Sequence, residues 1–138
     1  MTARELMTEN PAIVPPQATI AQAWDLMREL DIRHLPVVEG GVVVGMLSDR
    51  DVGSLDVGRA LTEEGADGLR RRLTRPVSQL MSTDVVAAEP ETDVSELITL
   101  FLEQKVGAIP VVLADSQQLV GIVSYIDILR AVQELLAD

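Results

Sequence analysis

The chain has 138 residues, 47% of them hydrophobic, and its 22 acidic and 11 basic residues give a net charge of −11. This charge repels polyanions, and one Trp, one Tyr and one Phe supply no row of stacking rings, so we expect no nucleic-acid partner. The absence of cysteine excludes disulfides and cysteine-ligated metals, and no apolar stretch is long enough to span a membrane. The composition predicts one compact cytoplasmic protein with no membrane partner.

The first half of the chain predicts a strand, a helix, a hairpin and a second helix. A short strand at 12–14 precedes a turn that contains prolines, and Thr19 with Gln22 has the spacing of a capping box. Apolar residues then recur at helical intervals, at Ile20, Ala23, Trp24 and Met27. Strands at 35–38 and 42–48 follow, and their valines at both alternating positions predict burial on both faces.

The second half predicts the same order of elements. A short strand at 85–88 precedes Asp93 and Glu96, which have the spacing of another capping box. Its helical apolar positions are Val94, Leu97, Ile98 and Phe101. Strands at 109–113 and 119–124 form the second hairpin, so each half is a β-α-β-β-α unit.

Three boundaries follow from this duplication. Repeat one covers 1–56, a linker covers 57–76, and repeat two covers 77–138 and ends in a helix at 127–136. The linker has no counterpart in the other repeat and holds five of the basic residues, Arg59, Arg70, Arg71, Arg72 and Arg75. We expect a solvated helix face there, with contact to a phosphate or an acidic partner as the alternative.

The two hairpins end in nearly the same motif. Residues 45–51 and 121–127 each contain a glycine, two apolar residues, a serine and, three residues on, an aspartate. Other pairs lie at a constant offset of 74, for example residues 6–8 with 80–82, where Leu-Met-Thr matches Leu-Met-Ser. The offset grows to 76 at the glycines because the second hairpin turn is longer than Gly40-Gly41 in the first, where positive φ angles allow a tight turn.

On these residues the chain resembles a tandem pair of cystathionine β-synthase (CBS) domains, a Bateman module. The resemblance rests on the two Gly-apolar-apolar-Ser-x-x-Asp motifs, preceded by Leu-Pro-Val-Val at 35–38 and Ile-Pro-Val-Val at 109–112. It implies an α/β fold of the α+β type, in which two β-α-β-β-α repeats pack about a pseudo-two-fold axis. It also implies two clefts between the repeats that bind adenosine-containing ligands, namely AMP, ADP or ATP, or alternatively S-adenosylmethionine or NAD, with no required cofactor.

By this resemblance Ser48 and Ser124 would contact phosphate, and Asp51 and Asp127 would bind the ribose. A serine before a helix offers its hydroxyl beside free backbone N–H groups, and an aspartate one turn later can accept from both ribose hydroxyls. The alternative is that each Ser-x-x-Asp only caps its helix, and both roles can coexist. The base would lie among aliphatic residues, which could equally be ordinary core: Ile13, Val14, Leu35 and Pro36 in one cleft, and Val86, Ala108, Ile109 and Pro110 in the other.

The two motifs differ in their neighbouring charge. Repeat one has Arg33, His34 and Arg50 around its motif, where repeat two has Gly107, Ala108 and Ile126. We therefore expect the first cleft to prefer the more phosphorylated ligand. The alternative for the single histidine is an ordinary half-buried side chain, because a metal site needs several converging donors.

The sequence contains no signature of an enzyme or of a metal site. It has no set of nucleophile, histidine and acid with a local signature. Asp49 and Asp51 could together hold Mg²⁺, but two alternating carboxylates are common on a surface turn. The segment 97–102 is apolar nearly all round its helix, which predicts a symmetric homodimer. We expect a regulatory sensor of energy state or metabolites that is read by a regulated protein, with a structural dimerisation module lacking a ligand as the alternative.

Overall fold

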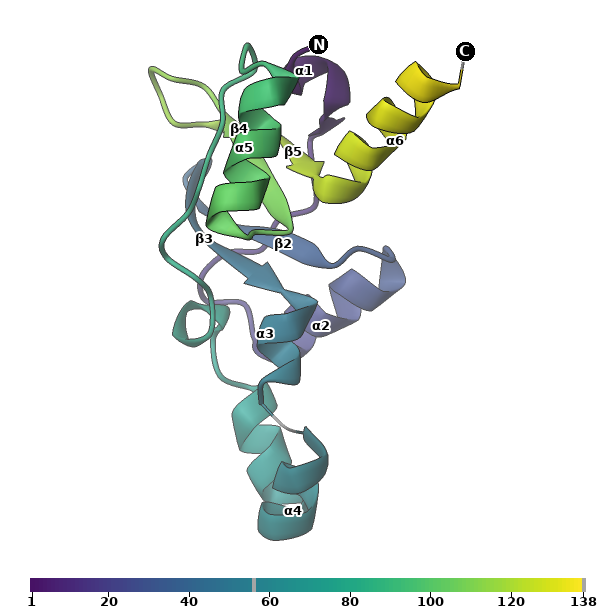
Figure 1. Cartoon of the computed structure of the whole chain (residues 1–138). Helices are drawn as coiled ribbons and strands as arrows, with labels where there is room; N and C mark the ends of the chain where they lie inside the picture. The colour runs from purple at the N-terminus through teal and green to yellow at the C-terminus, as the bar shows by residue number, and fades with distance from the viewer. Residues whose placement is uncertain (56, 138) are drawn as a thin grey trace. The chain divides into compact units, whose positions relative to one another are not determined.

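The computed structural model describes residues 1–55 and 57–137, and it divides into two compact units that we treat separately. The central unit consists of Ala12–Glu39 and Val44–Asp84. The terminal unit consists of Met1–Pro11, Gly40–Val43 and the chain from Val85 onward. The fold is mixed α and β with two similar repeats, as predicted from the sequence (Figure 1). Among the described residues, no helix combines the length and the apolar character that crossing a membrane requires.

The central unit contains most helices and strands of repeat one, together with the linker helix and the start of repeat two. Its elements are α2 (Ile20–Glu29), β2 (His34–Glu39), β3 (Val42–Ser48), α3 (Asp49–Gly53), α4 (Val57–Leu73) and the short 3-10 helix η1 (Val77–Gln79). Strand β3 belongs to this unit from Val44 onward. Thr19 begins α2 with the predicted capping box, since its side chain accepts from the backbone N–H of Gln22, whose side chain accepts from the backbone N–H of Thr19. The helix buries Ile20 and Met27 against Leu35 and Leu47 of the strands.

The terminal unit contains the elements of repeat two together with the start of the chain. These are α1 (Ala3–Leu6), β1 (Thr8–Glu9), α5 (Val94–Gln104), β4 (Ala108–Val112), β5 (Leu119–Ser124) and α6 (Tyr125–Leu136). The three strands form an antiparallel sheet in the order β1-β5-β4. Its core is centred on Leu97 of α5 and on Ile109 and Val123 of the strands, all with no exposed surface.

The first residues of each repeat pair with the last strand of the other repeat. In the terminal unit, Thr8 of β1 lies opposite Ile122 of β5. In the central unit, the backbones of Ser82 and Met46 exchange two hydrogen bonds of 2.9 Å. The repeated Leu-Met-Thr and Leu-Met-Ser segments are therefore edge strands or bridges, a role that the sequence pattern alone did not reveal.

Two local predictions were wrong. The segments at 12–14 and 85–88 are not strands, because each forms a single parallel bridge, Val14 with Val37 and Ala88 with Val111. Prolines close to both segments remove backbone donors and limit φ, which prevents a longer ladder. The second capping box is also absent: Asp93 caps α5 by accepting from the backbone N–H and hydroxyl of Ser95.

The first strand of each hairpin contains a proline. It is tolerated because its backbone N and C=O point away from the hairpin partner strand. The carbonyl of Pro110 in β4 accepts from Ala88 N–H at 3.0 Å, and the carbonyl of Pro36 in β2 accepts from Val14 N–H at 3.1 Å. In a strand the N and C=O of one residue lie on the same side, so the missing N–H of each proline costs no bond to the hairpin partner. Gly40 and Gly41 have φ of 60° and 83°, which confirms the predicted tight turn.

The linker forms helix α4, which is interrupted at Gly65, where φ is 74°. Three of its arginines pair with carboxylates of the same segment: Arg59 with Glu63, Arg70 with Asp67 and Arg72 with Glu64. This agrees with the predicted solvated helix face. The boundaries proposed for the two repeats and the linker remain a prediction, because the compact units do not follow the sequence repeats.

Candidate functional site

The repeat-one motif ends in a closed capping box at the junction of β3 and α3. Ser48 is the N-cap of α3, and its Oγ accepts from the backbone N–H of Asp51 at 3.1 Å. In return, Oδ2 of Asp51 accepts from the backbone N–H of Ser48 at 2.8 Å. The alternative left open by the sequence, helix capping, is therefore a real function of this pair.

The repeat-two motif has the same arrangement at the junction of β5 and α6. The Oγ of Ser124 accepts from the backbone N–H of Asp127 at 3.3 Å, and Oδ2 of Asp127 accepts from the backbone N–H of Ser124 at 2.8 Å. In this copy the two side chains also lie within 3.1 Å of each other, with the hydroxyl of Ser124 as the donor. Both serines and both aspartates are half-buried.

Each aspartate uses only one of its two carboxylate oxygens in the capping box. Within the part of the chain that the structure describes, Oδ1 of Asp51 and Oδ1 of Asp127 accept no hydrogen bond. An ionised carboxylate has about four acceptor positions, so capping uses only part of its capacity. The capping box thus fixes the direction of each carboxylate without occupying it fully.

The glycine of each motif allows close approach of the exchanged segment. A Cβ on Gly45 would clash with Sδ of Met81 and lie 2.8 Å from its Cγ, and a Cβ on Gly121 would do the same with Met7. The glycines therefore belong to the packing of the motif, and they bring the segments at 81–82 and 7–8 against the strands that carry the serines.

A backbone hydrogen bond joins each motif to the start of its hairpin. Asp49 N–H donates to the carbonyl of Arg33 at 2.9 Å, and Tyr125 N–H donates to the carbonyl of Gly107 at 3.2 Å. In repeat one this contact brings Arg33 beside the first turn of α3, which carries Arg50. The structure therefore places together the basic residues that the sequence associated with Ser48.

His34 follows Arg33 in the chain and is half-buried. Burial lowers the pKa of His34 below its ordinary value, against the opposing effect of Asp49 and Asp51, and the charges of Arg33 and Arg50 lower the pKa further. The imidazole thus interacts electrostatically with four charged groups. One of them, Asp49, was not among the site residues predicted from the sequence. Its position between Ser48 and Asp51 in the motif could have indicated it.

The aliphatic residues expected around the base differ in exposure. Leu35 and Ile109 have no exposed surface, and Val14 and Ala108 are buried at 5% and 6%. The prolines at 36 and 110 are also fully buried, whereas Ile13 is 45% exposed and Val86 is half-buried. The buried members belong to the core, and their contact with a ligand stays a prediction.

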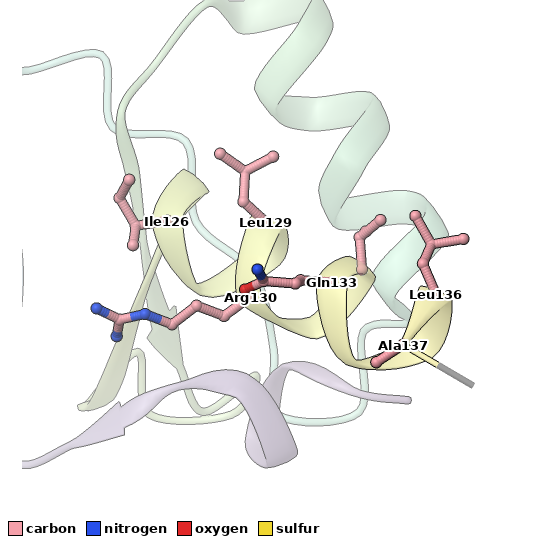
Figure 2. Close-up of a pocket in the computed structure, with 7 residues that line it drawn as sticks. Ile126, Leu129, Arg130, Gln133, Leu136 and Ala137 are labelled. Carbon is pink, nitrogen blue, oxygen red and sulfur yellow. The ribbon is translucent and has the colours of Figure 1, made fainter.

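Among the described residues, one surface groove lies on α6 and another beside α2. The first follows α6, as Figure 2 shows, and it is lined by Ile126, Leu129, Arg130, Val132, Gln133, Leu136 and Ala137. The other includes Val14 and residues of α2, among them Gln22, Asp25 and Glu29. Neither groove is lined by the motif serines or aspartates. Among the described residues, no group of three or more His, Cys, Asp or Glu side chains could hold a metal ion.

The profile of the CBS domain matches this chain twice, at residues 3–55 and 77–134. The chain belongs to the CBS-domain family. Both matched segments contain one complete Gly-apolar-apolar-Ser-x-x-Asp motif, so this result confirms the tandem CBS pair, or Bateman module, that the duplicated motif indicated.

Two relatives show what the chain is similar to in sequence. It is 35% identical over 125 residues to the CBS domain-containing protein YhcV of Bacillus subtilis, a match covering 91% of this chain and 81% of that protein. It is 29% identical to inosine-5′-monophosphate dehydrogenase of Methanocaldococcus jannaschii, covering 93% of this chain but 23% of that enzyme. Similarity to an enzyme is therefore limited here to a minor part of the enzyme.

Among solved structures, the chain is similar to CBSX2 in complex with AMP. The two chains superpose with a TM-score of 0.80 and 28% sequence identity, and the match covers 97% of each. A CBS pair of this size and fold therefore binds an adenine nucleotide in a related protein.

Proposed function

We propose that this CBS pair is a regulatory module that binds an adenosine-containing ligand at the Ser-x-x-Asp motifs and acts as a sensor of energy state or metabolites. The single observation that carries the proposal is the same capping box in both repeats, with one free carboxylate oxygen in each. The AMP complex of the similar protein CBSX2 supports the choice of ligand.

The capping box makes each aspartate a suitable acceptor for a ribose. Its Oδ2 is held by the backbone N–H of the serine at 2.8 Å in both repeats, so the carboxylate does not have to be ordered when a ligand binds. Hydrogen bonds from two ribose hydroxyls to this ionised group are charge-assisted and contribute about 1.5–3 kcal/mol each. The hydroxyl of Ser48 can donate to a phosphate while it still accepts from the backbone, whereas Ser124 would first have to release its hydrogen bond to Asp127.

Sensing requires that the ligand bind one conformation of the protein more tightly than another. The ligand would then shift the population that a regulated partner protein recognises. The candidate ligands are AMP, ADP, ATP, NAD and S-adenosylmethionine.

A purely structural dimerisation module is the second candidate, because apolar residues are exposed on two helices of the terminal unit. Leu102 of α5 is 72% exposed, and Leu129, Leu135 and Leu136 of α6 are 57%, 67% and 78% exposed. A homodimer would cover such residues, and it is compatible with either function. Sedimentation at micromolar concentration should give a dimer, and a monomer alone would contradict this part of the proposal.

Thermal unfolding in the presence of each candidate ligand tests the function. A ligand at 100 times its Kd adds about 2.7 kcal/mol of stability, which raises the Tm of a domain of this size by several degrees. We expect Asp51→Ala and Asp127→Ala each to reduce the shift and the double variant to abolish it. Asp115→Ala is the matched control, because Asp115 is exposed in the β4–β5 turn and no interaction of its side chain is recorded among the described residues.

Two outcomes decide between the candidates. If no ligand changes the Tm of the unmodified protein, the sensor is excluded and the dimerisation module is favoured. If the ligand shift is unchanged in the double variant, a ligand binds elsewhere and the role assigned to the motifs is wrong.

A further inference from the structure

Two exposed arginines of the central unit converge on the repeat-one motif from different segments. Arg33 precedes β2 and Arg50 lies in the first turn of α3, and the hydrogen bond from Asp49 N–H to the carbonyl of Arg33 holds these segments together at 2.9 Å. Both side chains are exposed, and neither forms an ion pair within the described part of the chain. Their guanidinium groups are available to an anion.

The charges around this motif cancel at neutral pH. Arg33 and Arg50 contribute two positive charges, Asp49 and Asp51 contribute two negative charges, and all four act on the imidazole of His34. The sum is therefore zero (2 − 2) with a neutral histidine. This balance is local, since the chain as a whole has a net charge of −11.

The matching positions of repeat two carry no positive charge. Gly107, Ala108, Tyr125 and Ile126 stand where repeat one has Arg33, His34, Asp49 and Arg50, so the formal charge at the matching positions comes from Asp127 alone. The formal sum over these positions is −1, and Arg130 lies one turn beyond Asp127 in α6. Ala108 is 6% exposed, whereas Tyr125 and Ile126 are 46% and 40% exposed, so the first turn of α6 presents apolar surface instead of guanidinium groups.

We propose that the two sites divide their ligands by charge: the repeat-one site takes a nucleoside di- or triphosphate, and the repeat-two site takes an adenosyl ligand with little negative charge. The proposal rests on the proposed function and assigns a ligand class to each of its two sites. Arginine recognises phosphate oxygens through paired charge-assisted hydrogen bonds, so the preference should grow with the number of phosphates. At the repeat-two site the same phosphates would meet the carboxylate of Asp127 without basic residues at the positions that match Arg33 and Arg50.

Calorimetric titration of single-site variants with AMP and with ATP tests this division. Asp127→Ala leaves the repeat-one site and Asp51→Ala leaves the repeat-two site. We expect the ratio of ATP affinity to AMP affinity to be at least about tenfold higher in Asp127→Ala than in Asp51→Ala, which corresponds to one charge-assisted hydrogen bond.

Removing and adding the charge should move this ratio in opposite directions. In the Asp127→Ala background, Arg33→Ala with Arg50→Ala should lower ATP affinity by about tenfold or more and AMP affinity by less. In the Asp51→Ala background, Ile126→Arg places a guanidinium on an exposed position and should raise ATP affinity. Arg71→Ala in α4 is the control, because Arg71 is exposed and has no recorded ion pair in the described residues.

The outcomes separate this inference from the proposed function. Equal ratios in the two single-site variants, or an equal loss of AMP and ATP on removal of the arginines, overturn the division by charge while nucleotide binding stands. The absence of any binding in the unmodified protein overturns both. A rise in the ratio with Ile126→Arg, together with a fall on removal of the arginines, supports the division.

Discussion

The two repeats share their backbone framework and differ in the side chains that surround it. In both, a serine and an aspartate close a capping box, and in both a glycine accommodates a methionine of the exchanged segment. Beside the motif the two repeats differ in charge, as at Arg50 against Ile126. The framework is thus fixed by packing and backbone hydrogen bonds, and under our proposal a few exposed positions determine the ligand chemistry.

The glycines provide the strongest way to test the shared framework. We expect Gly45→Ala and Gly121→Ala each to lower the free energy of unfolding by about 1–3 kcal/mol, because the added Cβ overlaps a methionine and lies within 3.1 Å of a backbone carbonyl. Urea unfolding measures the change. Gly58→Ala is the control, because a Cβ there meets no described atom within 4 Å, and its effect should be neutral or stabilising.

This experiment compares the loss of unfolding free energy in Gly45→Ala with that in Gly121→Ala. The carbonyls near the two glycines belong to Ser82 and Thr8 and would lie 3.1 and 3.0 Å from the new Cβ atoms. Losses that differ by more than about 1 kcal/mol would show that one exchanged segment yields more easily than the other. No loss at either position would contradict the packing role of the glycines.

Elements with strong local signals were predictable from the sequence. The capping box at Thr19 and the strand Val42–Ser48 occur where they were predicted, because capping spacing and runs of valine act over a few residues. The pairing of Thr8 with Ile122 was not predictable in this way. A two-residue strand has no periodicity, and its partner is more than a hundred residues away in the chain.

The candidate site was predictable only in part. The duplication located Ser48, Asp51 and their counterparts, and the fold brings Arg33 and Arg50 to the repeat-one motif as expected. The sequence could not decide between capping and ligand binding, because the same hydroxyl and carboxylate serve both. It also could not show that Leu35 and Ile109 are completely buried, since core residues and pocket residues have the same apolar character.

The capping serines give a smaller test of the same comparison. We expect Ser48→Ala and Ser124→Ala each to lower the free energy of unfolding by about 0.5–2 kcal/mol, because each removes the acceptor for one backbone N–H at a helix start. Urea unfolding of both variants measures it. Ser78→Ala is a control, because Ser78 is exposed and its side chain makes no recorded hydrogen bond in the described residues.

A difference between these two variants would have a specific cause. Ser124 also donates to Asp127 at 3.1 Å, whereas no such side-chain bond is recorded between Ser48 and Asp51 in the described residues. The loss should therefore be slightly larger for Ser124→Ala. The reverse order would indicate that the short helix α3 depends on its cap more than the longer α6 does.

The smallest expected effect is a pH dependence that only repeat one can show. Burial lowers the pKa of His34, so the unfolded chain takes up a proton at this residue at a higher pH than the folded protein does. The free energy of unfolding should therefore decrease as the pH falls through 6.5, the ordinary pKa of histidine, and continue to decrease until the folded protein also becomes protonated. Urea unfolding at pH 7.5, 6.5 and 5.5 measures this decrease, and His34→Gln should reduce it. Repeat two has the buried Ala108 at the matching position and cannot show this effect. If the decrease were unchanged in His34→Gln, other groups would cause it. The charged surroundings of His34 would then not distinguish the stability of the two repeats.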